Sequence, residues 1–279
     1  MIYYDGVTRA AATPSKPLLR VVKPGRAPRV QEPVAPGHEN RKADRVAKEI
    51  LRRVIQGDFP IGSVLPKEAD LALSFGVNRG VVREAMKLLE MQGIVHPVRR
   101  RGTLVKDPLA SLSPDVLRAL MQPEPGRIDT AFFRGVLAMR ELLDVEMAGL
   151  AARHRTRADV VAIQRQFAIV RGTLAEPARF QEETYRLALT IARATKNPLY
   201  QMLVHWNQAV VRDLDHVFAT IRAATGPWVS GMEMFVRAIA DGDEPAARQL
   251  VASFHAWASP RLLATARLAN GDPIEEIRG

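Results

Sequence analysis

The segment from residue 65 to residue 105 constrains the fold more than any other part of the chain. Its apolar spacing predicts a short helix over residues 67–75, and Gly76 ends that helix because a tight helix–helix junction commonly needs positive φ. Asn78 is a favourable N-cap, so a second helix is expected over residues 79–92. The segment therefore predicts a helix-turn-helix.

A basic hairpin is expected directly after these two helices. Two short β-rich runs, IVHPV and GTLVK, flank a tip made of Arg99, Arg100, Arg101 and Gly102. Three adjacent arginines repel one another unless a polyanion is present, and the glycine would let the backbone approach a phosphate or enter the minor groove. A hairpin in this place is typical of a winged helix-turn-helix, which inserts one helix into the major groove of DNA.

The second helix of this unit has two different faces. Its inward-facing residues are apolar: Val82, Ala85, Met86 and Leu89. Arg79, Arg83 and Lys87 lie four residues apart and form a cationic stripe on the opposite face. Such a stripe is usually a solvated face, but this one lies between a helix turn and a basic hairpin. We therefore expect it to contact DNA.

The charge distribution agrees with a polyanionic partner for the N-terminal part. Residues 1–43 carry +5, residues 44–108 carry +4 and residues 109–279 carry only +1. Residues 1–43 hold six prolines without sustained periodicity, which predicts a disordered basic leader that either touches phosphates or is a tolerated extension. A helix is expected from an N-cap at Asp44 to Gly57.

These residues resemble the DNA-binding domain of the GntR family of bacterial transcription regulators. The matching motifs are Gly62-x-x-Leu65-Pro66, Phe75-Gly76-Val77, Asn78-Arg79-x-x-x-Arg83-Glu84, Leu88-Leu89-x-x-x-Gly93 and Arg101-Gly102. The resemblance implies DNA contacts at Asn78, Arg79, Gly80, Arg83, Arg101 and Gly102, with the helix arginines reading guanine edges. The family usually has an arginine where this chain has Ala69, and Lys67 could supply the missing contact.

The rest of the chain is expected to be helical. Helical patterns run over residues 113–122, 128–153, 156–174, 178–195, 198–221, 227–241 and 243–267. Antiparallel helices of this number and length form a bundle with room for a central cavity. The stretches MRELLDVEMAGLAARHRT, ALTIARATKNPLY and FVRAIADGDEPAARQLV resemble the FCD effector domain of the FadR-type subfamily.

Many FCD domains bind a divalent metal through one Asp, a His four residues later and two further His. Aligning this chain on Asn197-Pro198 and Gly242-Asp243 puts the four positions at Thr184, Ala188, Met232 and Phe254. None is a usual ligand. Glu183 and His255 lie one residue away, and one residue turns a helical side chain by ~100°. The resemblance therefore implies no metal, no cofactor and a cavity that accepts an organic ligand directly, as in the acyl-CoA-responsive members.

Two residues of the helical domain are candidates for ligand binding. Arg140 matches a position that the family often uses inside the cavity, where a guanidinium could hold a carboxylate through a bidentate pair. Asp144 shares its helix face, so an intramolecular ion pair is the alternative. Trp206 and Trp228 are expected to be core residues rather than ligand stackers. His205 and His216 lie eleven residues apart, too far to share an ion.

Together these observations predict a mainly α protein. We expect a leader (1–43), a winged helix-turn-helix (44–108), an all-α antiparallel bundle for effector binding and dimerisation (109–270) and a tail (271–279). The expected function is a homodimeric repressor of a palindromic operator on double-stranded DNA, controlled by an organic acid or acyl-CoA. The alternative is an architectural DNA-binding dimer with a vestigial ligand domain; a metal-dependent enzyme fused to a DNA-binding head is disfavoured.

Composition excludes several other classes. Since the chain has no cysteine, disulfides, thiolate metal ligands and a thiol nucleophile are excluded. The sequence also lacks a Ser-His-Asp spacing, a Gly-rich phosphate loop and an HExxH motif, so we expect no enzyme. No apolar run approaches the ~20 residues of a membrane span, and no signal-like apolar core begins the chain. We therefore expect a cytoplasmic, nucleoid-associated bacterial protein without a membrane partner.

Overall fold

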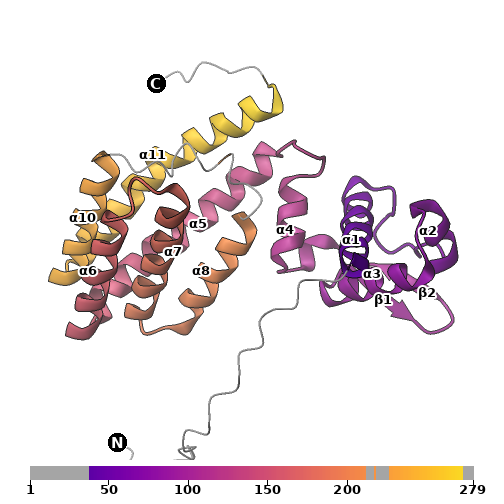
Figure 1. Cartoon of the computed structure of the whole chain (residues 1–279), viewed down its shortest axis with the longest axis horizontal. Helices are drawn as coiled ribbons and strands as arrows, with labels where there is room; N and C mark the ends of the chain where they lie inside the picture. The colour runs from indigo at the N-terminus through magenta and orange to yellow at the C-terminus, as the bar shows by residue number, and fades with distance from the viewer. Residues whose placement is uncertain (1–37, 212–216, 218–225, 273–279) are drawn as a thin grey trace, which may run out of the picture. The chain divides into compact units, whose positions relative to one another are not determined.

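The computed structural model describes residues 38–211, residue 217 and residues 226–272 of the chain. Described residues 38–105 form a winged helix-turn-helix (Figure 1). Its elements are α1 (His38–Gln56), α2 (Glu68–Phe75), α3 (Arg79–Met91), β1 (Val95–Val98) and β2 (Gly102–Val105). The predicted helix-turn-helix and hairpin are confirmed, with helix ends within one residue of those expected. The leader proposed for residues 1–43 lies mostly outside the described residues.

The first helix begins earlier than the sequence predicted. It starts at His38 rather than after an N-cap at Asp44, while Gly57 ends it with φ +87° as expected. Ala43 is buried at 2% exposure, so the apolar stripe of α1 begins before the N-cap predicted at Asp44. No proline follows Pro36 in this stretch, so nothing in the sequence breaks the helix before Asp44.

One apolar core holds the winged helix together. The inward faces of α1 and α3 supply most of it, including Ile50, Leu51, Val82, Ala85 and Leu89, and each is no more than 2% exposed. Full burial of each leucine, isoleucine or valine side chain among them contributes roughly 1.5–3 kcal/mol, which exceeds what helix propensity alone provides. The cationic side of α3 is therefore left facing outward by the packing of its other side.

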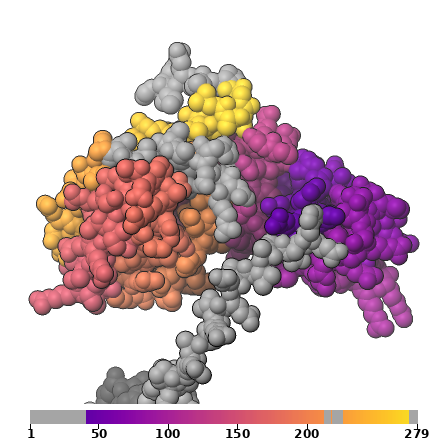
Figure 2. Space-filling model, viewed as in Figure 1, coloured from indigo at the N-terminus to yellow at the C-terminus, as the bar shows by residue number. Residues whose placement is uncertain are grey.

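Strand β2 of the hairpin is paired along both of its edges. Val95 pairs with Val105 and Val98 with Gly102 in an antiparallel register. The connector after α1 joins the other edge of β2, where the Leu65 amide donates to the Thr103 carbonyl at 2.8 Å. This pairing holds the connector against β2 at the base of the wing. In the space-filling view the wing projects from the surface (Figure 2).

The described residues after Val105 are helical and follow the predicted pattern. The elements are a 3₁₀ turn (Pro108–Ala110), α4 (Pro114–Met121), α5 (Thr130–His154), α6 (Arg157–Arg171), α7 (Pro177–Ala194), α8 (Pro198–Val211), α10 (Gly226–Asp241) and α11 (Glu244–Asn270). The long helices α5 and α11 run side by side (Figure 1). In the described part of the chain, no helix combines the length and apolarity needed to cross a bilayer.

Two apolar cores lie within the bundle. One is built on α5, α6, α7, α10 and α11, with Ile163, Leu187 and Ile239 at 1% exposure or less. The other joins the start of α5 to α8 and the end of α11, around Phe133, Val210 and Leu262. Helix α11 continues through Pro260, which is exposed, so the strong break expected of an internal proline does not occur there.

Candidate DNA-binding surface and ligand cavity

The start of α3 is fixed by local hydrogen bonding. Gly76 adopts the left-handed conformation with φ 62°, and Asn78 then caps the helix by accepting a hydrogen bond from the Val81 amide at 2.8 Å. A Cβ on Gly80 would lie 3.2 Å from the Asn78 Oδ1 atom, so a glycine leaves this cap uncrowded. Asn78 and Gly80, predicted as DNA contacts, therefore also have structural roles.

The predicted cationic residues of α3 are exposed. Arg79 has no ion-pair partner among the residues that the structure describes. Arg83 donates from Nε to the Glu68 Oε2 atom of α2 at 2.8 Å, and Lys87 pairs with Glu84 at 2.9 Å. The structure therefore brings the three cations to one open face, and it adds an acidic partner for Arg83 that the sequence analysis did not identify.

The remaining predicted DNA contacts lie beside this helix in the same domain. Lys67 is exposed immediately before α2, and Arg101 is exposed at the wing tip. Arg100 and Gly102 both have positive φ, at 64° and 99°. A Cβ on Gly102 would approach the Val64 Cγ1 atom at 2.8 Å. The glycine is thus required by the packing of the wing as well as by any approach to DNA.

The bundle contains a cavity of about 310 Å³. It is lined by α5, α7, α8, α10 and α11, and most of its lining side chains are apolar. The four positions aligned with the metal ligands of FCD domains, Thr184, Ala188, Met232 and Phe254, all line it. At these four positions the cavity wall carries one hydroxyl group and three apolar side chains.

A polar chain crosses the wall of this cavity. Arg140 donates from Nε to the Asp144 Oδ2 atom at 3.1 Å, and the same oxygen is 3.0 Å from the His255 Nε2 atom of α11. Burial raises the pKa of Asp144, but the charge of Arg140 and the hydrogen bond from His255 outweigh it, so this pKa lies below its ordinary value of 3.8. The intramolecular Arg140–Asp144 ion pair, which was the alternative to ligand binding, is present, and both residues also line the cavity.

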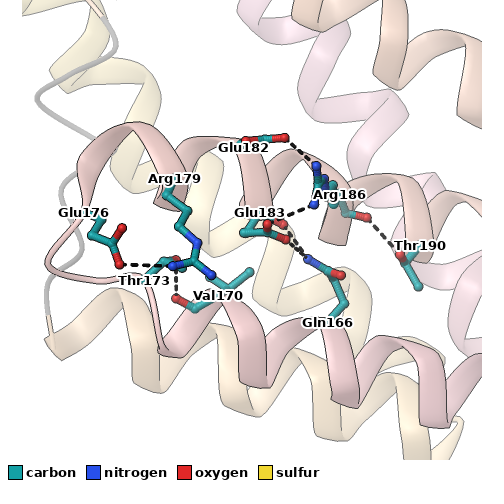
Figure 3. Close-up of polar contacts among 9 residues, drawn as sticks. All are labelled: Gln166, Val170, Thr173, Glu176, Arg179, Glu182, Glu183, Arg186 and Thr190. Carbon is teal, nitrogen blue, oxygen red and sulfur yellow. Dashed lines mark hydrogen bonds and ion pairs between the residues drawn. The ribbon is translucent and has the colours of Figure 1, made fainter.

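Glu183 and His255, each one residue from an aligned metal position, have different surroundings. Glu183 is 7% exposed and faces α6, where its Oε2 atom accepts from Gln166 Nε2 at 2.7 Å and its Oε1 atom contacts Arg186 at 3.0 Å (Figure 3). His255 lines the cavity instead. In the described part of the chain, no group of three or more His, Cys, Asp or Glu is placed to hold a metal ion.

Three further side chains complete the cavity wall. The Thr184 Oγ1 atom is buried and has no hydrogen-bond partner among the described residues. Trp206 donates from Nε1 to the Leu112 carbonyl at 2.8 Å, and Trp228 packs edge-on against Phe180 with ring centroids 4.9 Å apart. Both tryptophans are partly buried against the apolar cores, and both also line the cavity, so their position does not separate a core role from a ligand-stacking one.

The two histidines discussed from the sequence are not equally described. His205 of α8 contacts the Tyr185 hydroxyl through its Nδ1 atom and is exposed. The contact with Tyr185 accounts for the placement of the His205 ring, and no bound ion is needed to explain it. His216 lies outside the described residues.

Two family models match separate parts of the chain. Residues 42–105 match the family described as bacterial regulatory proteins, gntR family, and residues 136–255 match the FCD domain. The first match covers the winged helix, and the second spans the helices that line the cavity.

Several curated bacterial proteins are similar to this chain. An uncharacterised HTH-type transcriptional regulator of Mycobacterium tuberculosis is 26% identical over 219 residues, which cover 78% of this chain and 88% of the relative. The HTH-type transcriptional regulator LutR of Bacillus subtilis is 26% identical over 209 residues, covering 75% and 90%. The galactonate operon transcriptional repressor of Escherichia coli is 24% identical over 164 residues, covering 58% and 70%.

A solved structure shares the fold. Lar, which controls the expression of the Listeria monocytogenes agr system, superposes with a TM-score of 0.53 at 16% sequence identity. The superposition covers 79% of this chain and 95% of Lar.

Proposed function

Since the chain is a GntR-family transcriptional regulator with an FCD domain, we propose that it is a repressor whose operator binding is controlled by a small organic ligand in the bundle cavity. One observation carries the proposal: an exposed cationic recognition face and a ligand-sized cavity occur on separate domains of one chain. This arrangement suits a sensor whose ligand changes DNA affinity from a distance. The E. coli relative named as an operon repressor supports the sign of regulation.

The proposed DNA surface consists of seven residues: Lys67, Asn78, Arg79, Gly80, Arg83, Arg101 and Gly102. The arginines of α3 would read guanine edges in the major groove, since a guanidinium can donate to both O6 and N7 of guanine. The wing would follow the adjacent backbone or minor groove. A homodimer would present two such surfaces to a palindromic operator with half-sites roughly one helical turn, ~34–36 Å, apart on the nucleoid DNA.

We propose a small organic acid as the ligand, bound without a metal. Arg140 uses its Nε atom on Asp144, and its two terminal amino groups have no hydrogen-bond partner among the described residues. Those groups are suited to hold a carboxylate through two parallel hydrogen bonds. A cavity of about 310 Å³ is near the lower end of the range for small-molecule sites. It favours a compact acid over an acyl-CoA, whose nucleotide and pantetheine arm need far more room.

The DNA-binding proposal is tested by mobility shift with the chain's own genomic upstream region. Arg79→Ala combined with Arg83→Ala is expected to abolish the specific complex, because both guanidinium groups at the groove are removed. Arg165→Ala combined with Arg171→Ala, both on α6 and outside the winged helix, is the matched charge control and is expected to bind normally. Unchanged operator affinity in the double variant would contradict the recognition-helix assignment.

The ligand proposal is tested by thermal shift against a panel of organic acids and acyl-CoAs. A ligand that binds only the folded chain raises Tm by mass action. A specific acid should raise the Tm of the wild-type chain and should have a much smaller effect on Arg140→Met. No stabilisation by any compound would favour the alternative, an architectural DNA-binding dimer whose ligand domain is vestigial.

A further inference from the structure

Glu68 is placed to control how Arg83 meets DNA. It is the first residue of α2, and its Oε2 atom accepts the hydrogen bond from the Arg83 Nε atom of α3 at 2.8 Å. We propose that Glu68 is a positioning residue that sets operator specificity by orienting the Arg83 guanidinium. This inference rests on the proposed function, because it requires that Arg83 reads bases.

The contact with Glu68 leaves the two terminal amino groups of the Arg83 guanidinium available to bind a base. An arginine side chain carries five N–H donors, and the bond to Glu68 occupies the one at Nε. Among the described residues, Arg83 has no other hydrogen-bond or ion-pair partner. The two terminal amino groups can therefore donate together to the O6 and N7 atoms of a guanine. An arginine held in this way loses less rotamer freedom on binding than a free one.

Stability does not account for this ion pair. The side chains of Arg83 and Glu68 are 64% and 43% exposed, and ion pairs between such exposed groups contribute little to folding. An acidic residue in the first turn of α2 does interact favourably with the helix dipole. Asp70 provides the same interaction in the same turn, and no described cation pairs with it. The pairing with Arg83 is thus the feature that distinguishes Glu68 from its neighbour.

The Glu68 carboxylate on this face should lower the affinity for DNA, and this effect also favours discrimination between DNA sequences. Beside the phosphates of any duplex, the negative charge weakens binding regardless of sequence. The loss is recovered only where the positioned arginine finds a guanine. Glu68 would thus lower the affinity for every duplex, and the contact of Arg83 with guanine would offset this loss only on the specific sequence. The ratio of specific to non-specific affinity would therefore increase.

The inference is tested with the full-length chain on two duplexes. One is the sequence that the wild-type chain selects from a random duplex pool, and the other is a scrambled version of it. Glu68→Gln is expected to bind the scrambled duplex several-fold more tightly and to lower the selected-to-scrambled affinity ratio by about tenfold. Its salt dependence should steepen, since one repulsive charge near the phosphates is gone.

Asp70→Asn is the matched control. It removes the same charge from the same helix turn without touching Arg83. It is expected to leave the affinity ratio unchanged, although both duplexes can gain affinity. A ratio that falls equally in Asp70→Asn and Glu68→Gln would overturn the inference, because charge alone would then explain the effect. Circular dichroism melts of both variants should match the wild type, since both positions are at the surface.

The Arg83→Ala background separates this inference from the function on which it rests. If Arg83→Ala leaves the affinity ratio intact, the reading role of Arg83 fails and the proposed DNA surface fails with it. If Arg83→Ala lowers the ratio but Glu68→Gln does not, only the inference about Glu68 fails. In the double variant, Glu68→Gln should cause no further loss of the ratio. An additional loss would show that Glu68 acts through another group and would overturn the inference.

Discussion

At the scale of single residues, Gly102 meets two constraints at once. Its φ of 99° disfavours a side chain, and a Cβ would lie 2.8 Å from the Val64 Cγ1 atom. Gly102→Ala should therefore lower the free energy of local opening of the wing by about 1–3 kcal/mol. The measurement is hydrogen exchange at the Leu65 amide, which donates to the carbonyl of residue 103 on β2.

Gly57 is the matched control for the wing. Its φ of +87° is similarly unfavourable, but a Cβ there would meet no described atom within 4 Å. Gly57→Ala should therefore carry the backbone cost alone and leave the wing amides protected. Removing the obstacle with Val64→Ala should recover part of the loss in the Gly102→Ala chain. If the double variant exchanges as fast as the single one, the steric explanation is wrong.

Thr184 has a buried hydroxyl without a partner in the described structure. Thr184→Val replaces that hydroxyl by a methyl group of similar shape, so the variant should be as stable as the wild type or more stable, by up to ~2 kcal/mol. Thr173→Val is the comparison, because its Oγ1 atom donates to the Val170 carbonyl at 2.8 Å. Calorimetric unfolding should show that Thr173→Val lowers the free energy of unfolding by about 1 kcal/mol. A larger loss at Thr184 would reveal a hydrogen bond to its hydroxyl.

The lowered pKa of Asp144 makes stability depend on acid pH. The charged carboxylate is stabilised in the folded chain, so its contribution is present above the ordinary value of 3.8 and is lost as the pH falls through the lower folded value. Asp144→Asn should flatten the fall in the free energy of unfolding between about pH 5 and pH 2. Urea unfolding across this range measures the slope. The wild-type slope in the variant would show that Asp144 does not titrate this way.

At the scale of secondary-structure elements, α6 begins with a complete capping box. The Thr156 Oγ1 atom accepts from the Asp159 amide at 3.2 Å, and the Asp159 carboxylate accepts from the Thr156 amide at 2.7 Å. Thr156→Ala should lower the free energy of unfolding by about 1 kcal/mol. Ser113→Ala is the control, since the N-cap serine of α4 makes no side-chain cap bond. Equal losses in a thermal unfolding series would contradict the capping explanation.

The helices whose ends were well predicted carry explicit boundary residues. Gly76 and Asn78 placed the junction of α2 and α3. Helices α7 and α8 each begin at a proline, and their predicted first residues, 178 and 198, lie within one residue of the observed ones. The start of α1 was missed because a polar run without proline gives no stop signal, and only the burial of Ala43 in the tertiary structure shows that the helix continues. Local chemistry thus predicts a boundary where it includes a breaker or a cap.

At the scale of the whole molecule, contacts between distant residues escaped prediction. Asp144 and His255 are 111 residues apart, and Glu68 and Arg83 lie on different helices. The sequence indicated which residues could carry function, because charge and helical spacing are local properties. It could not indicate that His255 rather than Glu183 faces the cavity, because this depends on the rotation of packed helices about their axes.

The placement of the aromatic residues gives the protein its own optical reporter. All three tryptophans of the chain follow residue 200, and the DNA-binding domain has none. Trp206 and Trp228 line the cavity, while Trp257 stacks with Arg261, whose guanidinium lies 4.7 Å from the ring centroid. Tryptophan fluorescence should therefore change when a ligand enters the bundle cavity. It should not change when a structural change is confined to the winged helix. A change in emission on adding operator DNA alone would be a direct, label-free signal that the two domains communicate.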